Sequence, residues 1–122
     1  MPLSLRLIAL AVFILGFALM LWAMDANPFF SSAVRIQPDR GQRVIAVGPY
    51  RWVRHPGYAG AIPAMTASGP VLGSWLATAL GAAGVLWLVW RTGMEDQMLR
   101  TELVGYDDYA RKVRWRLLPG VW

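Results

Sequence analysis

The hydrophobic residues of this chain are gathered into two long blocks, and most polar residues lie in the segments that follow each block. The first block, residues 3–24, carries a single charge, Arg6. At about 1.5 Å per residue, a helix of this length can cross a hydrocarbon core of about 30 Å, which predicts a first membrane span over 3–24. A cleaved signal peptide is the alternative, but the stretch is long for one and no clear small-residue cleavage site precedes Asp25.

The second block, residues 57–90, runs for 34 positions without one charged residue. A single helix of that length would measure about 51 Å, too long for one crossing, whereas two full crossings need about 40 residues. Residues that favour a turn lie near the middle of the block: Pro63, Gly69, Pro70 and Gly73. We therefore expect two short helices, 58–70 and 73–90, packed as a hairpin whose glycines and alanines permit close backbone approach.

The polar segments after the two blocks complete the expected fold. Residues 91–104 predict a helix that leaves the membrane, and residues 106–114 a short amphipathic helix. The connection 25–56 holds five arginines against two aspartates, a bias typical of the cytoplasmic side, and its Phe29 and Phe30 are expected at the lipid interface. The sequence predicts a single-domain, all-α integral membrane protein with about three transmembrane helices. Its amino terminus would lie outside, and its connection and amphipathic carboxy-terminal tail in the cytoplasm.

The composition of the chain excludes several kinds of functional site. Charged residues make up 16% of the chain against roughly 25% in soluble domains, which agrees with a membrane protein. There is no cysteine, so disulfides, thiolate metal sites and a cysteine nucleophile are excluded. A single histidine leaves no cluster for a metal centre, and we expect no metal. The net charge of +5 could suggest nucleic acid, but the basic residues lie beside the apolar blocks, so no nucleic-acid partner is expected.

The first run of candidate functional residues is GPYRWVRHPGYAG, residues 48–60. It places two arginines, two tyrosines and the only histidine at the mouth of the expected hairpin. Polar side chains at a lipid boundary need partners, which makes this run a candidate site. Pro56 suits the first turn of a helix, so His55 would lie at a helix amino terminus, where the backbone favours anionic or oxygen-rich ligands.

The second run begins where the second apolar block ends. Residues spaced by three and four share one helical face: Arg91, Glu95, Leu99 and Glu102. A carboxylate on this face could bind the two hydroxyls of a ribose or pair with Arg51 or Arg54 across the cytoplasmic mouth. Structural roles stay open: Glu95 could simply pair with Arg91, the arginines could face lipid phosphates, and the tyrosines of the tail could anchor the interface.

The two runs resemble the signature of the isoprenylcysteine carboxyl methyltransferase and phospholipid N-methyltransferase superfamily. Its members carry GPY-R-x-V-R-H-P-x-Y-x-G before a membrane hairpin, then an acidic pair and a leucine, then F-G-x-x-Y-x-x-Y-x-x-x-V-x-R-x-x-P. Here the matching elements read GPYRWVRHPGYAG at 48–60, Glu95-Asp96 with Leu99, and VGYDDYARKVRWRLLP at 104–119. This chain departs from the pattern with an aspartate second in the acidic pair, a valine before the glycine, and tyrosines one residue closer to that glycine.

The resemblance implies an S-adenosylmethionine-dependent methyltransferase that acts on a lipid or lipid-attached carboxylate or amine. It implies catalytic roles nearest the methyl acceptor for Arg51, Arg54 and Glu95. The implied cofactor-binding residues are Tyr50, His55, Pro56, Tyr58, Glu95, Leu99, Tyr106 and Tyr109. Relatives normally carry further membrane helices before the first span seen here. We therefore expect either a minimal member or a second copy or partner helices that complete the lipid-facing wall.

Two other functions stay open. Membrane sterol reductases that use NADPH carry an S-R-H-P-N-Y-x-G-E run, from which this chain departs at Val53, Gly57 and Ala61. A non-catalytic membrane subunit of the same fold is the second alternative, because the additional helices of the relatives are missing from this sequence.

Overall fold

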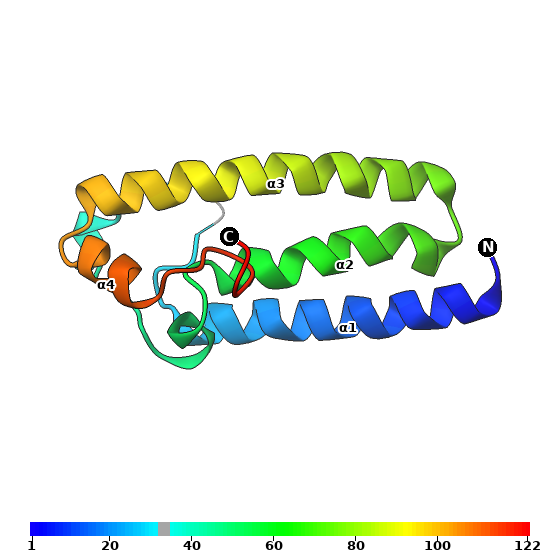
Figure 1. Cartoon of the computed structure of the whole chain (residues 1–122), viewed down its shortest axis with the longest axis horizontal. Helices are drawn as coiled ribbons and strands as arrows, with labels where there is room; N and C mark the ends of the chain where they lie inside the picture. Colours follow the sequence, from blue (N-terminus) through cyan, green and yellow to red (C-terminus); the bar gives the residue numbers. More distant parts are fainter. Residues whose placement is uncertain (32–34) are drawn as a thin grey trace.

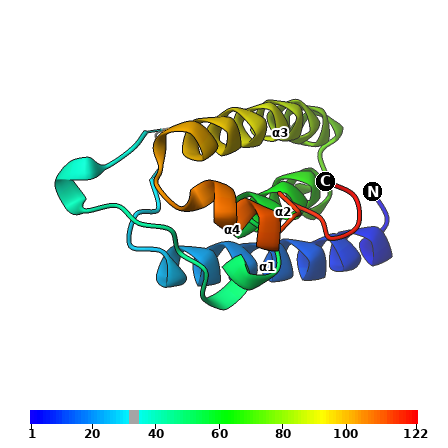
Figure 2. The same cartoon turned by 60° about the vertical axis from the view of Figure 1, so that its left-hand side comes forward.

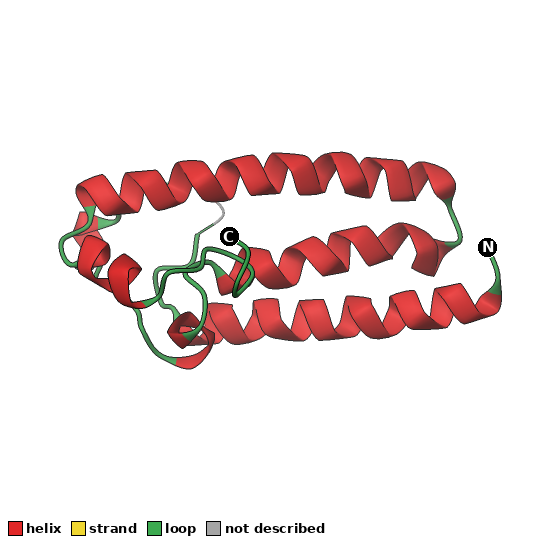
Figure 3. Ribbon diagram, in the orientation of Figure 1, coloured by secondary structure: helices red, strands yellow, loops and turns green. Residues whose placement is uncertain are grey.

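The structure is a computed structural model that describes residues 1–31 and 35–122; residues 32–34, in the expected connection, lie outside the described residues. All regular elements in these two ranges are helical (Figures 1 and 3). The α-helices are α1 (Leu3–Ala26), α2 (Pro56–Leu72), α3 (Trp75–Glu102) and α4 (Tyr106–Lys112), with 3-10 turns η1 (Pro38–Arg40) and η2 (Gly48–Arg51).

The three long helices lie side by side, and α2 packs against both α1 and α3 (Figures 1 and 2). The amino terminus and the α2–α3 turn lie at one end of this row, whereas the connection and α4 lie at the other. At the first end Arg6, the single charge in the first apolar block, donates from Nε and Nη2 to the Val71 carbonyl oxygen at 3.3 and 3.2 Å. It thereby binds a carbonyl at the end of α2 that lacks a helical partner.

Small residues let α1 and α2 approach closely. A Cβ atom built on Gly16 of α1 would lie 2.6 Å from the carbonyl oxygen of Gly60, and one built on Gly60 would lie 2.6 Å from the Met20 nitrogen. On the other side of α2, a Cβ on Gly81 would lie 2.7 Å from the Met65 carbonyl oxygen. Because no real Cβ approaches backbone so closely, these glycines set the spacing of the row, as is common where helices pack in a membrane.

The contact between α1 and α2 predicts a steric effect. Gly16→Val should destabilise the protein by about 1–3 kcal/mol, since its side chain must force the two backbones apart. Ala11→Val introduces the same side chain on the exposed face of α1 and should change stability by less than about 0.5 kcal/mol. Unfolding in detergent micelles would measure both variants. Equal stability of the two would contradict this account of the packing.

The outer faces of the row are apolar. Large hydrophobic side chains are exposed along both outer helices, among them Leu7, Ile8 and Leu15 on α1 and Leu76, Leu80 and Leu86 on α3. By length and composition, α1 and α3 can each cross a membrane. The shorter α2 has 17 residues without a charge and lies between them, so the three-span interpretation stays a prediction.

The boundaries of the hairpin differ from those expected. The turn occurs at Gly73, which has a positive φ of 69°, and α2 extends from Pro56 to Leu72 rather than over 58–70. Helix α3 continues without interruption from the apolar block through the expected separate helix 91–104. The change from apolar to polar residues near Arg91 alters the surroundings of the helix but removes no backbone hydrogen bond, so α3 does not end there.

The connection folds back onto the helices through its own polar contacts. Gln37 is buried, and its Nε2 donates to the Phe29 carbonyl oxygen at 2.9 Å. Arg40 donates to Gln37 Oε1 and to the Pro28 carbonyl oxygen, both at 2.7 Å. Phe29 is buried, and the ring of Phe30 contacts Gly57. The expectation that Phe29 lies at the lipid interface was therefore wrong, because these hydrogen bonds turn the segment inward. For Phe30, which is half-buried, the expectation stays a prediction.

Candidate functional site

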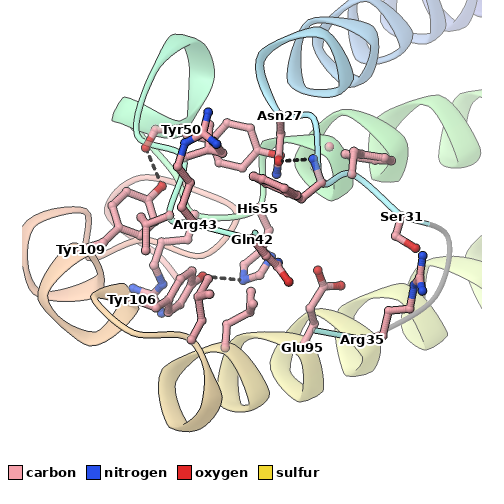
Figure 4. Close-up of a pocket in the computed structure, with 18 of the residues that line it drawn as sticks. Asn27, Ser31, Arg35, Gln42, Arg43, Tyr50, His55, Glu95, Tyr106 and Tyr109 are labelled. Atoms are coloured by element: carbon pink, nitrogen blue, oxygen red, sulfur yellow. Dashed lines mark hydrogen bonds between the residues drawn. The ribbon is translucent and has the colours of Figure 1, made fainter. Parts of the chain in front are cut away.

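A pocket opens at the end of the row where the connection, the start of α2, the end of α3 and α4 meet (Figure 4). Its enclosed volume is about 70 Å³, and its mouth is open to solvent. Helix α3 measures about 42 Å against about 26 Å for α2, so its last turns extend past the start of α2. The pocket is lined by Asn27, Phe29, Phe30, Ser31, Arg35, Gln42, Arg43, Val44, Ile45, Tyr50, Arg54, His55, Gly57, Tyr58, Glu95, Leu99, Leu103, Tyr106 and Tyr109.

Asp96 lies behind the wall of this pocket and is 1% exposed. Its Oδ1 accepts hydrogen bonds from Arg54 Nε at 2.8 Å, His55 Nε2 at 3.0 Å and the Tyr106 hydroxyl at 3.0 Å. Its Oδ2 accepts from Arg54 Nη2 at 2.7 Å and from Arg116 Nε at 3.1 Å. One buried carboxylate thus joins the segment before α2, helix α4 and the tail. We call Asp96 and its four partners the Asp96 cluster; the partners are Arg54, His55, Tyr106 and Arg116.

Arg54 is fully engaged in holding this wall. Besides the two bonds to Asp96, its Nη1 donates to the carbonyl oxygens of Val113 at 3.1 Å and Arg114 at 3.0 Å. Burial lowers the pKa of the guanidinium, but the hydrogen bonds and charge of Asp96 outweigh burial, so the pKa lies above its usual value. Arg54 is therefore a permanently charged structural tie between the start of α2 and the tail.

A second polar group faces the pocket from α2 and α3. The Tyr58 hydroxyl donates to Glu95 Oε2 and accepts a hydrogen bond from Arg91 Nε at 3.2 Å. The ring of Tyr58 stacks on His55, with centroids 6.0 Å apart and planes 15° from parallel. This arrangement places the Glu95 carboxylate beside two flat rings at one side of the pocket.

Three tyrosines form the opposite end of the pocket (Figure 4). The Tyr109 hydroxyl donates to the Tyr50 carbonyl oxygen at 2.6 Å, which ties α4 to η2. Asn27 Nδ2 donates to the Tyr50 hydroxyl at 3.1 Å, leaving that hydroxyl its own hydrogen to donate. Burial, opposed by the Asn27 bond and reinforced by the charge of Glu95, raises the pKa of Tyr50 to about 12. Its phenol is therefore neutral at physiological pH.

The pKa values of the two tyrosines of α4 are raised as well. Burial and then the negative charge of Asp96 raise the pKa of Tyr106 far above its usual value. Burial, followed by the neighbouring phenol of Tyr50, raises the pKa of Tyr109. The two rings meet edge to face with centroids 5.5 Å apart. Both phenols thus present rigid neutral rings at this end of the pocket.

Comparison with known proteins assigns the fold to a family. The sequence pattern of the isoprenylcysteine carboxyl methyltransferase (ICMT) family matches residues 7–101. The chain belongs to this family. No curated protein matches the chain. Membership in the ICMT family, together with two helices long and apolar enough to cross a bilayer, identifies an integral membrane protein.

A solved structure of similar shape agrees with this assignment. The structure of the eukaryotic intramembrane Ras methyltransferase ICMT, without a monobody, aligns with a TM-score of 0.80 and 25% sequence identity. The match covers 97% of this chain and 43% of that one. The ICMT-like fold is therefore shared over nearly the whole chain, which spans less than half the length of that protein.

The structure brings most of the site residues predicted from the sequence to one pocket. The predicted residues that line it are Tyr50, Arg54, His55, Tyr58, Glu95, Leu99, Tyr106 and Tyr109. Pro56 and Arg51 are not among the lining residues. Pro56 is buried as the first residue of α2, as its sequence context predicts. What the lining residues bind stays a prediction.

Arg51 is the predicted catalytic residue that the structure separates from the others. Its side chain is exposed, its Nε donates to the Gly48 carbonyl oxygen at 3.1 Å, and its guanidinium lies 5.0 Å from the centroid of the Trp52 ring. The 3-10 turn of η2 directs Tyr50 inward and Arg51 outward. The pocket lining therefore gives no support to the predicted place of Arg51 nearest the acceptor, which stays a prediction.

Several residues in the pocket or directly behind its wall were not predicted from the sequence. Asp96 was noted only as part of an acidic pair, although that pairing was the signal that could have identified it. The connection supplies Arg35, Gln42 and Arg43, the last with its guanidinium 5.5 Å from the centroid of the Phe29 ring. The sequence pattern assigns Arg35 and Arg43 a topological role alone, and no local pattern shows that the connection folds over the pocket.

Proposed function

We propose that this chain transfers the methyl group of S-adenosylmethionine to a lipophilic acceptor at the membrane surface. The main support is the pocket in which Glu95 and Tyr58 face His55 and the tyrosines of α4, in a chain of the ICMT family. A non-catalytic subunit would have no need of such a closed set of polar and aromatic groups.

The lining residues fit the chemistry of this cofactor. When bound, S-adenosylmethionine supplies a methyl group that a positively charged sulfur has already activated. Glu95 offers a negative charge for a cation, and the faces of Tyr58 and Tyr106 offer cation–π contacts of about 0.5–2 kcal/mol each. The Tyr50 hydroxyl supplies a donor for a polar group of the nucleoside or amino acid part.

Alignment and exclusion of water are what the protein must add. The Tyr58 bond to Glu95 and the Asp96 bond to His55 hold these groups in fixed positions before any ligand arrives. Phe29 and Phe30 line the same pocket and would limit the access of water.

We assign Glu95 the catalytic role nearest the transferred group. We assign Arg54 the role of holding the wall, because all its bonds point to Asp96 and backbone carbonyls.

The position of the pocket supports a lipophilic acceptor. It lies at the end of helices whose outer faces are apolar, where a soluble cofactor and a lipid can both reach it. The basic residues around it favour the cytoplasmic side. The acceptor is a lipid or lipid-attached carboxylate or amine, and Arg35 and Arg43 in the lining favour an anionic group.

Ligand titration tests the proposal. Purified protein should bind S-adenosylhomocysteine and should not bind NADPH, as followed by the fluorescence of its seven tryptophans. Incubating membranes with radiolabelled S-adenosylmethionine should then yield a labelled lipid fraction that identifies the acceptor. Tight nicotinamide binding with indifference to S-adenosylhomocysteine would instead support the reductase alternative and reject methyl transfer.

A further inference from the structure

Arg116 belongs to the carboxy-terminal tail and does not line the pocket, yet it contacts the group that holds the pocket wall. Its Nε donates to Asp96 Oδ2 at 3.1 Å, and its side chain is 30% exposed. The other partners of Asp96 are buried. Arg116 therefore completes the Asp96 cluster from outside the pocket lining, where solvent can still reach it.

The backbone of the tail also binds the segment that carries the histidine. The Arg54 nitrogen donates to the Trp115 carbonyl oxygen at 2.8 Å, and the His55 nitrogen donates to the Arg116 carbonyl oxygen at 2.9 Å. Arg116 thus holds His55 twice, directly through the main chain and indirectly through Asp96, which binds the imidazole. A residue with both contacts can fix the direction of the ring as well as its location.

The end of the tail folds back over Arg116. The nitrogens of Leu117 and Leu118 donate to the Trp122 carbonyl oxygen at 2.9 and 3.1 Å. This turn places the Trp122 ring over the Arg116 guanidinium, 4.8 Å from the centroid to Cζ. The ring lies next to Gly93 of α3, where a Cβ atom would make an ordinary van der Waals contact with it at 3.8 Å. The guanidinium is held between a carboxylate and an aromatic face, which limits its motion.

We infer that Arg116 is a positioning residue, which fixes the His55 imidazole and the Tyr106 hydroxyl in the pocket wall by holding Asp96. Without it, Oδ2 keeps only the bond from Arg54, and the carboxylate loses the contact that the tail supplies. Both groups bound to Oδ1 would then be held less firmly, because only Arg54 would still fix the plane of the carboxylate. The consequence for ligand binding rests on the proposed function, whereas the consequence for the imidazole does not.

His55 is the sole histidine of the chain, so a ¹⁵N-histidine-labelled sample reports one imidazole. The carboxylate of Asp96 only accepts, so the parent protein should show one tautomer with the hydrogen on Nε2. In Arg116→Gln this Nε2–H signal should broaden or give way to a mixture of tautomers. The dissociation constant of S-adenosylhomocysteine should also rise about tenfold or more, since a charge-assisted bond is lost.

Two further variants make the test specific. Arg116→Lys keeps the charge but not the planar fork, and should restore part of both losses. Arg114→Gln removes an exposed arginine from the same tail; its side chain stacks on Trp115 and its backbone contact to Arg54 is retained. It should leave the imidazole signal unchanged and the affinity within about twofold of the parent.

Each outcome has a clear meaning. A single unchanged tautomer with unchanged affinity in Arg116→Gln overturns the inference. Equal losses in Arg114→Gln and Arg116→Gln also overturn it, because they would reflect the overall charge of the tail. If the parent binds no S-adenosylhomocysteine while the imidazole still responds to Arg116→Gln alone, the positioning role stands and the proposed function fails.

Discussion

Replacing Asp96 with alanine should destabilise the protein by about 3–5 kcal/mol and abolish cofactor binding, since the change leaves the buried cation Arg54 without its counter-charge. His55, Tyr106 and Arg116 would lose an acceptor in the same step. Asp96→Asn keeps the shape but offers one acceptor oxygen in place of two, so it should retain only a minor part of the stability. Chemical unfolding in detergent and titration with S-adenosylhomocysteine measure both effects.

Asp108 supplies the matched control for this prediction. Its side chain is 79% exposed on α4 and lies 3.6 Å from Arg111 in a surface ion pair. Asp108→Ala should therefore change stability by less than about 0.5 kcal/mol and leave cofactor binding intact. An Asp96→Ala protein that unfolds at the same denaturant concentration as the parent would show that the cluster does not stabilise the fold.

Glu95→Gln should lower methyl transfer about 100-fold while the protein stays folded. Glu95 lines the pocket and accepts the hydrogen of Tyr58, and the amide keeps this volume while it removes the negative charge. Since the charge would face a cationic donor, affinity for S-adenosylmethionine should fall more than affinity for the neutral S-adenosylhomocysteine. Turnover with radiolabelled donor and titration with both ligands measure the two effects.

Glu102→Gln makes the same chemical change two turns further along α3. Glu102 is exposed and does not line the pocket, so turnover and both affinities should stay within about twofold of the parent. Full activity in Glu95→Gln, or an equal loss in the two variants, would remove Glu95 from the catalytic role and leave it a structural partner of Tyr58.

Much of the helical layout follows from the sequence because lipid-exposed backbone must satisfy its own hydrogen bonds. The uncharged run 57–90 had to form helices, and its length together with Gly73 required a turn in the middle. Likewise, proline at the first position of α2 predicted where that helix begins. The motif residues of 48–60 and of the tail were correctly expected to meet, because both follow the blocks on the same side of the row.

The different roles of neighbouring residues could not be predicted from the sequence. Glu95 and Asp96 are adjacent acids, but successive helical residues point about 100° apart, so one faces the pocket and the other the buried cluster. Arg51 and Arg54 are equivalent by composition, and only the turn at η2 separates an exposed side chain from a buried one. Local pattern carries no information about which neighbour packs against α4 and the tail.

The sequence alone determined the apolar helices, the turn between α2 and α3 and the family signature, because each depends on residues close together in the chain. The tertiary structure decided that Asp96 holds the wall, that Arg116 supports it from behind and that the connection covers the pocket. The bonds of Asp96 to Arg116 and to Arg54 join residues 20 and 42 positions apart in sequence. They form only when α3, α4 and the tail pack together, since a buried charge needs partners that its own helix cannot supply.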